Sequence, residues 1–139
     1  TAVMAAAQER GKMAVAYHSD MRKIGPDAQI IAVTHQWGDY YTARVKAAMS
    51  GRWTSGSVWG GVKEGMIRVG DFGPKVPAKV QDEVQAKQKA VGAGKLKPFA
   101  GPITDNEGKL VLPAGQSLSD AQILNMNYLV QGVLGRVTR

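Results

Sequence analysis

The sequence contains no cysteine, so a disulfide framework and a thiolate metal site are both excluded. It also contains no apolar run of the roughly 20 residues that a membrane-spanning helix needs. Proline is scarce, with six residues against 17 glycines, which indicates many tight turns and no disordered tract. What is left is a globular class, because 139 residues of which 44% are hydrophobic suffice for one domain with a core of its own.

Recognisable catalytic motifs are missing as well. There is no Gly-x-Ser-x-Gly nucleophile motif and no glycine-rich phosphate loop, so nothing in the sequence supports an enzyme, and we expect no cofactor. A metal site needs three or more converging ligands. The single candidate set is His18, Asp20 and His35, and we expect it to serve other purposes than metal binding.

The charge is unbalanced but not clustered. There are 18 basic and 11 acidic residues, a net charge of +7, yet no run of five or six lysines or arginines occurs. Scattered charge is typical of a solvated surface, whereas a nucleic-acid-binding module needs a contiguous basic face and shows steep salt dependence. We therefore expect no nucleic-acid partner.

The hydrophobic pattern predicts an α/β fold. One helical stripe, made of Tyr41, Val45 and Ala48, is expected to face the core, with Asp39 capping that helix. The chain reads as helix from Thr1, without an initiator methionine, so we expect a fragment of a longer protein. The expected elements are helices at 1–10, 39–50, 77–91 and 119–124, strands at 13–17, 30–34, 66–72 and 128–134, a short strand near 58–62, and a hairpin turned at 105–108.

Two of these strands end in polar residues. The first apolar run is followed by His18 and Asp20, and the second by His35, Gln36 and Trp37. Short apolar runs bounded by turn signals are typical of buried strands in a parallel sheet, and ligands of open α/β sheets bind beyond the carboxyl ends of such strands. Both histidines of the chain lie there, so we predict that the two strand ends form one ligand crevice.

Six motifs, in this order, resemble the basic membrane protein family of substrate-binding lipoproteins of ABC importers, which includes purine nucleoside receptors. The resemblance covers nearly all of this chain and less than half of a whole family member. The motifs are Ala16-Tyr17-His18-Ser19-Asp20-Met21, Trp37-Gly38-Asp39-Tyr40-Tyr41, Gly51-Arg52-Trp53, Trp59-Gly60-Gly61-Val62-Lys63-Glu64-Gly65, Pro98-Phe99-Ala100-Gly101-Pro102-Ile103 and Asn127-Tyr128-Leu129-Val130-Gln131-Gly132-Val133.

This resemblance implies a type I periplasmic-binding-protein fold, with two Rossmann-like lobes that close on a ligand, of which this chain is a C-terminal fragment. Residues 1–34 would supply part of one lobe and a crossing strand, and residues 35–139 segments of both lobes. The implied function is capture of a purine nucleoside or purine base for an ABC transporter permease. The implied location is the periplasm, or a lipid anchor on the outer side of the inner membrane.

Four residues are predicted to contact the ligand: His18, Asp20, His35 and Trp37. An imidazole can both donate and accept hydrogen bonds, which suits the mixed edge of a purine, and Trp37 can stack on a flat ring. The family often has an aspartate where His18 stands and a lysine near His35, so a base fits here at least as well as a nucleoside. Ordinary structural interpretations stay open, namely a loop histidine, a surface aspartate, a hydrogen bond from His35 at the helix entry and a Trp37 packed under that helix.

Another function is compatible with the same architecture. The chain could be the effector-binding domain of a transcription regulator, whose output would be a DNA-binding headpiece. The residues upstream of Thr1 would discriminate the two, because a lipoprotein signal ending in cysteine indicates transport and a headpiece indicates regulation.

Overall fold

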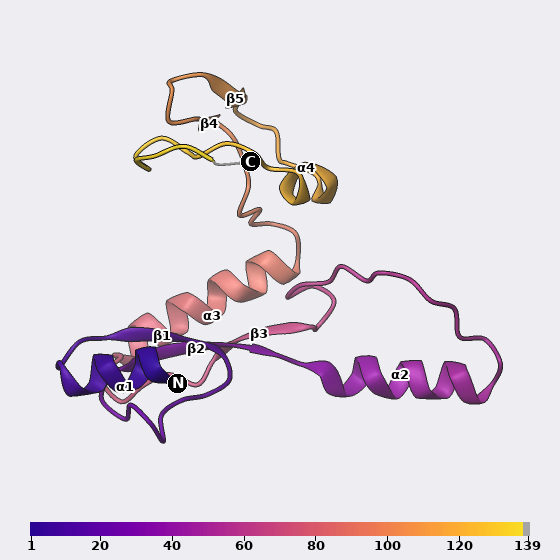
Figure 1. Ribbon diagram of the computed structural model, residues 1–139, viewed down its shortest axis with the longest axis horizontal. Coiled ribbons are helices and arrows are strands. Elements are labelled where there is room, and N and C mark those ends of the chain that lie inside the picture. Colours follow the sequence, from indigo (N-terminus) through magenta and orange to yellow (C-terminus); the bar gives the residue numbers. More distant parts are fainter. Residues whose placement is uncertain (138–139) are drawn as a thin grey trace. The chain divides into compact units, whose positions relative to one another are not determined.

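A computed structural model describes residues 1–137 (Figure 1). The chain divides into two compact units, Thr1–Lys95 and a second unit that begins at Leu96. The division after Lys95 does not test the predicted lobe boundary near residue 34, which stays a prediction. None of the helices among the described residues is both long and apolar enough to cross a membrane.

The first unit is built on a three-stranded sheet with the order β1-β2-β3. The strands β1 and β2 are parallel, as predicted, and His18 lies beside Thr34. The strand β3 runs antiparallel to β2, with Ile67 beside His35. In chain order the elements are α1 (Ala2–Glu9), β1 (Ala14–His18), β2 (Gln29–His35), α2 (Trp37–Met49), β3 (Ile67–Gly70) and α3 (Ala78–Gly92).

Small residues form the centre of this unit. Met4 of α1 is buried against Ala16 of β1, Ala28, and Ala32 of β2. Alanine side chains let the helix approach the sheet closely, and Gly25 allows the same for the loop between β1 and β2, since a Cβ there would meet the Met4 side chain at 2.8 Å. This packing fixes α1 and the loop against one face of the sheet.

The second unit contains a hairpin and a short helix, both as predicted. The strands β4 (Ile103–Thr104) and β5 (Leu110–Leu112) pair antiparallel around the expected turn. The helix α4 (Asp120–Leu124) starts with a capping box, in which Gln122 N donates to Ser119 Oγ and Ser119 N donates to Gln122 Oε1.

Two predicted strands are not formed. Residues 52–61 have no regular secondary structure, because the glycine-rich sequence there has too few alternating apolar residues to form a ladder. The segment 128–134 contributes only an isolated bridge between Asp105 and Val130. Its apolar run suggested a strand, but a turn at Gly132, whose φ is positive, interrupts it.

The helix α2 differs from the prediction in two ways. It begins at Trp37, directly after Gln36, so Asp39 lies in the first turn, where a negative charge favours the helix dipole, and is not the cap. Its predicted core stripe is exposed, with Tyr41 at 59% and Val45 at 58%. The reason is that α2 extends away from the sheet, and no other helix or strand of its unit packs extensively on it (Figure 1).

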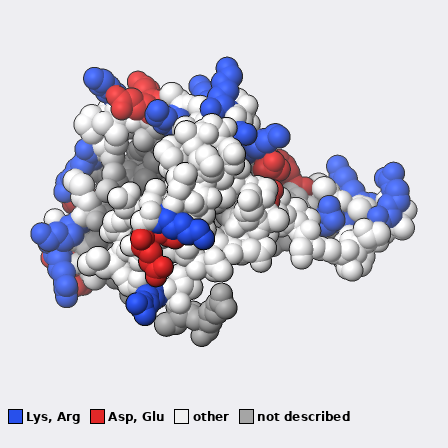
Figure 2. Space-filling model, turned by 90° about the horizontal axis from the view of Figure 1, so that it is seen from above, with Lys and Arg blue, Asp and Glu red and all other residues white. Residues whose placement is uncertain are grey.

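Basic side chains are spread over the surface. On the face drawn in Figure 2 they lie at separate places with acidic groups among them.

Candidate ligand site at the ends of β1 and β2

The parallel pairing brings the two histidines together. His18 is the last residue of β1 and His35 the last of β2, and their ring centroids are 4.8 Å apart. The prediction that the two strand ends meet at one edge of the sheet is therefore confirmed. Their role in holding a ligand stays a proposal, which is argued below.

The histidines belong to a chain of rings, which we call the ring cluster: Tyr17, His18, His35, Trp37 and Tyr41. His35 stacks on Trp37 with centroids 5.3 Å apart and planes inclined by 23°, and Trp37 stacks on Tyr41 at 5.9 Å and 25°. Tyr17 meets His18 at 4.0 Å and the edge of His35 at 5.7 Å. The cluster is open to solvent, since Trp37 is 41% exposed and Tyr17 57% exposed.

His18 adopts an unusual backbone conformation. Its φ is +76°, in the left-handed region that favours glycine and that few other residues adopt, among them asparagine, aspartate and histidine more often than the rest. Such a conformation costs on the order of 1–3 kcal/mol and persists only where the surroundings enforce it. Strain of this kind concentrates at functional sites, and here it turns the chain back after β1.

His35 has an incompletely satisfied ring. Its Nδ1 atom is buried and has no hydrogen-bond partner within residues 1–137. A buried polar nitrogen without a partner costs about 1–3 kcal/mol.

Asp20 lies in a different environment. Its carboxylate accepts three hydrogen bonds from the Arg22 guanidinium, at 2.6–3.0 Å, and one from Gln29 Nε2 at 3.0 Å. The side-chain hydrogen bond from Arg22 holds the pKa of Asp20 well below its usual range. No hydrogen bond joins Asp20 to either histidine within the described residues, so its predicted contact with a ligand stays untested.

Comparison with known proteins decides the family. Residues 1–107 match the family described as ABC transporter substrate-binding protein PnrA-like. The chain belongs to this family. The predicted resemblance and the α/β, periplasmic-binding-protein-like fold class are thereby confirmed.

Two relatives align with the PnrA-like chain over almost its whole length. A purine-binding protein of Brucella abortus is 38% identical over 133 residues, which are 96% of this chain and 38% of the relative. A putative ABC transporter glucose-binding protein of Haloferax volcanii is 25% identical over 136 residues, 98% of this chain and 32% of the relative. The PnrA-like chain therefore spans about a third of the length of these relatives.

A solved structure shares the fold. The transcriptional activator of the comK gene from Bacillus halodurans superposes with a TM-score of 0.60 and 21% identity, over 69% of this chain and 34% of that one. At this identity the likeness shows the fold alone.

Two members of the ring cluster were not predicted as site residues. Tyr17 pairs with Val33, and side chains alternate along a strand, so Tyr17 and His35 share a face of the sheet. That alternation was the available signal. Tyr41 follows Trp37 by four residues, the spacing that puts two side chains on one side of a helix.

Gln36 joins β2 to α2 and is tied to the sheet. Its Nε2 donates to Thr34 Oγ1 at 3.2 Å, and that hydroxyl donates to the Arg68 carbonyl at 3.4 Å. Beside it lies a hollow of ≈ 380 Å³, lined by Gln36, Val62, Gly65, Ile67, Arg68, Gln88, Lys89 and Gly92. None of the ring-cluster residues lines this hollow, which lies between Gln36, β3 and α3.

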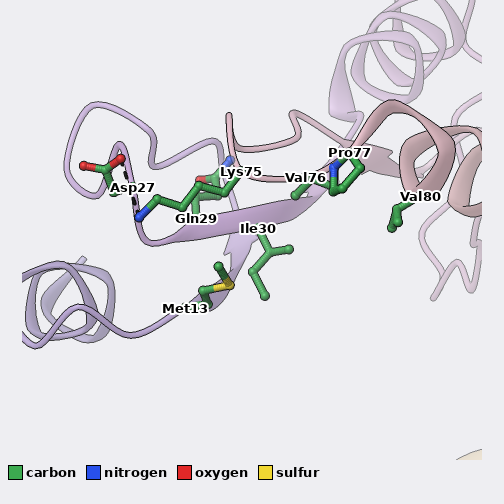
Figure 3. A pocket seen from close by; sticks show the side chains of 8 residues that line it. All are labelled: Met13, Asp27, Gln29, Ile30, Lys75, Val76, Pro77 and Val80. Atoms are coloured by element: carbon green, nitrogen blue, oxygen red, sulfur yellow. Dashed lines mark ion pairs between the residues drawn. The ribbon is translucent and has the colours of Figure 1, made fainter.

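A smaller hollow lies at the beginning of β2, far along the strand from the ring cluster. It has a volume of ≈ 220 Å³ and a mainly apolar lining, and Lys75 Nζ pairs with Asp27 Oδ1 at 3.7 Å on its rim (Figure 3). No group of three possible metal ligands converges anywhere within residues 1–137. Neither this hollow nor the ion pair on its rim adds a chemical function to the candidate site.

Proposed function

We propose that this protein is the substrate-binding component of an ABC importer and that it holds a purine base or nucleoside at the ring cluster. Family membership supports the transport role, and the relative from Brucella abortus is named for purine binding. The observation that carries the proposal is the arrangement of His18, His35 and Trp37 at the carboxyl ends of β1 and β2.

Stacking would supply much of the affinity. His35, Trp37 and Tyr41 are already nearly parallel to their neighbours in the run of rings, and Trp37 and Tyr41 are exposed, so a purine can pack against this aromatic surface. Stacking of a base on an aromatic side chain contributes about 1–3 kcal/mol. It does not depend strongly on which base is bound.

Hydrogen bonds would supply the selectivity. An imidazole has two ring nitrogens that can form hydrogen bonds. Because Nδ1 of His35 is buried, His35 would offer Nε2 to the ligand, and His18 would supply a second polar contact on the edge of the purine. A site built this way discriminates against ligands that leave one of its polar groups unpaired. Contacts of this kind need no ribose, which makes a free base as suitable as a nucleoside.

The remainder of the mechanism follows from the family architecture. The ligand would be enclosed in the cleft between two lobes by a hinge motion, and the closed form would be presented to a membrane permease. This assigns the protein to the periplasm, or to a lipid anchor outside the inner membrane. An effector-binding role in transcription is less well supported, because the matching family is described as a transport family and the comK activator shares the fold alone.

The test is a calorimetric titration of the natural full-length protein with adenine, hypoxanthine, adenosine, inosine and glucose. We expect saturable binding of at least one purine compound, and about a tenfold weaker affinity in Trp37→Ala, equivalent to about 1.4 kcal/mol of lost stacking. Trp53→Ala is the matched control, because Trp53 is similarly exposed, at 52%, and lies outside the ring cluster.

Two results would contradict the proposal. One is binding of glucose with no response to any of the four purine compounds. The other is equal loss of purine affinity in the Trp37 and Trp53 variants, which would separate binding from the ring cluster.

A further inference from the structure

The loop that returns from β1 to β2 is fastened to the sheet by one buried amide. Gln29, the first residue of β2, is 2% exposed. Its Oε1 accepts from Met21 N at 2.7 Å, and its Nε2 donates to Asp20 Oδ1 at 3.0 Å and to the Asp71 carbonyl at 2.6 Å. A single side chain thus joins the residues after β1, the start of β2 and the residues after β3.

Four charged residues around Gln29 extend this connection. Together with Gln29 we call them the polar clamp, which consists of Asp20, Arg22, Gln29, Arg68 and Asp71. Arg22 pairs with Asp20 at 2.6 Å and approaches Asp71 at 3.7 Å, and Arg68 pairs with Asp71 at 2.6 Å. Asp20 Oδ1 also accepts from the backbone N of Arg22 at 3.0 Å. Every charge in the clamp has an opposite charge beside it.

The clamp acts two residues away from His18. After the left-handed turn at His18, the chain folds back so that Asp20 and Met21 reach Gln29. Gln29 itself lies beside Ala14, whereas His18 lies beside Thr34, so Gln29 is at the far end of the paired strands. The amide therefore fixes the backbone that follows His18 without being near the ring cluster.

We infer that Asp20 is a positioning residue, which with Gln29 and Arg22 holds the turn at His18 and thereby sets its imidazole against His35. The inference rests on the proposed function, and it assigns Asp20 a role in affinity that needs no contact with the purine. A left-handed histidine relaxes unless its neighbours are held, and Asp20 and Met21 are the neighbours that the clamp holds. Preorganisation of this kind raises affinity because the ordering cost is met before the ligand arrives.

The first test needs no ligand. Histidine labelled at Cε1 is introduced into the natural full-length protein, and the nuclear Overhauser effect between the His18 and His35 rings is measured by NMR. We expect a clear cross-peak in the wild type and a loss of more than half of its intensity in Gln29→Met, which keeps the side-chain length but removes all three hydrogen bonds.

The matched control is Gln8→Met. Gln8 Oε1 accepts from Asp27 N and Ala28 N, both at 3.0 Å, so this variant loosens the other end of the same loop. We expect its cross-peak to stay at the wild-type intensity. Arg22→Ala covers the case in which Gln29→Met does not fold, because Arg22 is a surface residue whose side chain is 44% exposed. It should weaken the cross-peak as well.

The second test uses adenine and adenosine as probes. We expect Kd to rise about tenfold in Gln29→Met and in Asp20→Ala, with the double variant little weaker than either single one, because both changes remove the same restraint. If Asp20 touched the ligand instead, Asp20→Ala alone would weaken binding, and Gln29→Met and Arg22→Ala would bind as the wild type does. That result, or an unchanged cross-peak in Gln29→Met and Arg22→Ala, would overturn the inference. Absence of purine binding by the wild type would count against the proposed function alone, since the ligand-free test stands without it.

Discussion

At the scale of single residues, His18 combines two properties that rarely occur together. It carries a side chain that the candidate site needs, and it occupies a backbone conformation, φ +76°, that favours glycine. Glycine fits this conformation without strain, and asparagine, aspartate and histidine adopt it more often than other residues do. The two properties can be separated by substitution, since glycine keeps the turn and removes the imidazole.

This conflict predicts opposite effects on stability and binding. In His18→Gly the free energy of unfolding should be unchanged or higher by up to about 1 kcal/mol, because the left-handed strain is relieved, while purine affinity falls at least about tenfold. His18→Val should lose about 1–2 kcal/mol, since a β-branched residue fits this region worst. Urea denaturation and calorimetry measure the two quantities.

The control for this pair is His35→Val. His35 ends a regular strand, where a β-branched residue is favoured, so affinity should fall without a comparable loss of stability. Equal destabilisation by valine at both positions would show that the backbone at His18 is not under strain.

At the scale of elements, the approach of the segment after β3 to the start of β2 depends on one glycine. Gly73 N donates to the Ile30 carbonyl at 2.9 Å, and a Cβ on Gly73 would overlap the Gln29 carbonyl oxygen. A backbone atom cannot yield as the end of a flexible side chain can. The residue after it is Pro74, so the chain turns away at once.

We therefore expect Gly73→Ala to lower the free energy of unfolding by about 2–3 kcal/mol, because relief of the overlap must separate the two segments. Gly38→Ala is the control, since a Cβ at this position in α2 meets nothing within 4 Å. It should be neutral or stabilising by up to about 1 kcal/mol. Chemical denaturation measures both, and equal stability of the two variants would contradict the predicted overlap.

Elements also show what a sequence can and cannot predict. β1, β2 and α3 were predictable because short apolar runs and a proline-led amphipathic pattern are local signals. The meeting of His18 with His35 followed from parallel pairing. The clamp between Asp20 and Gln29 was not predictable, because it depends on a left-handed turn that no neighbouring residue demands. The prediction that the apolar stripe of α2 faces the core was wrong for a similar reason. Periodicity shows that a helix has an apolar face, but it does not show whether another element covers that face.

At the scale of the whole molecule, net charge alone gives little specificity. The +7 charge arises from side chains that are interspersed with acids, and within residues 1–137 three basic groups, Arg22, Arg68 and Lys75, are paired with aspartates. The other basic groups are scattered along the chain with no run of five or six, so few of them can displace counterions from any one stretch of nucleic acid.

Accordingly, we expect only weak, sequence-independent binding to a 20-base-pair duplex at low salt, which is lost between roughly 50 and 200 mM salt. Fluorescence anisotropy of a labelled duplex measures it, with a poly-lysine of similar net charge as the positive control. Submicromolar binding that persists at 200 mM salt would contradict the assignment of the basic charge to a solvated surface.

One structural feature has a mechanical consequence. Gln36 is the single residue between the last residue of β2 and the first of α2, and its side chain is bonded to Thr34. A one-residue connection of this kind restricts the angle between β2 and α2. His35 and Trp37 lie on either side of this connection. A change in the orientation of α2 would therefore change the stacking of Trp37 on His35. Conversely, a molecule bound against these two rings would restrict the orientation of the helix.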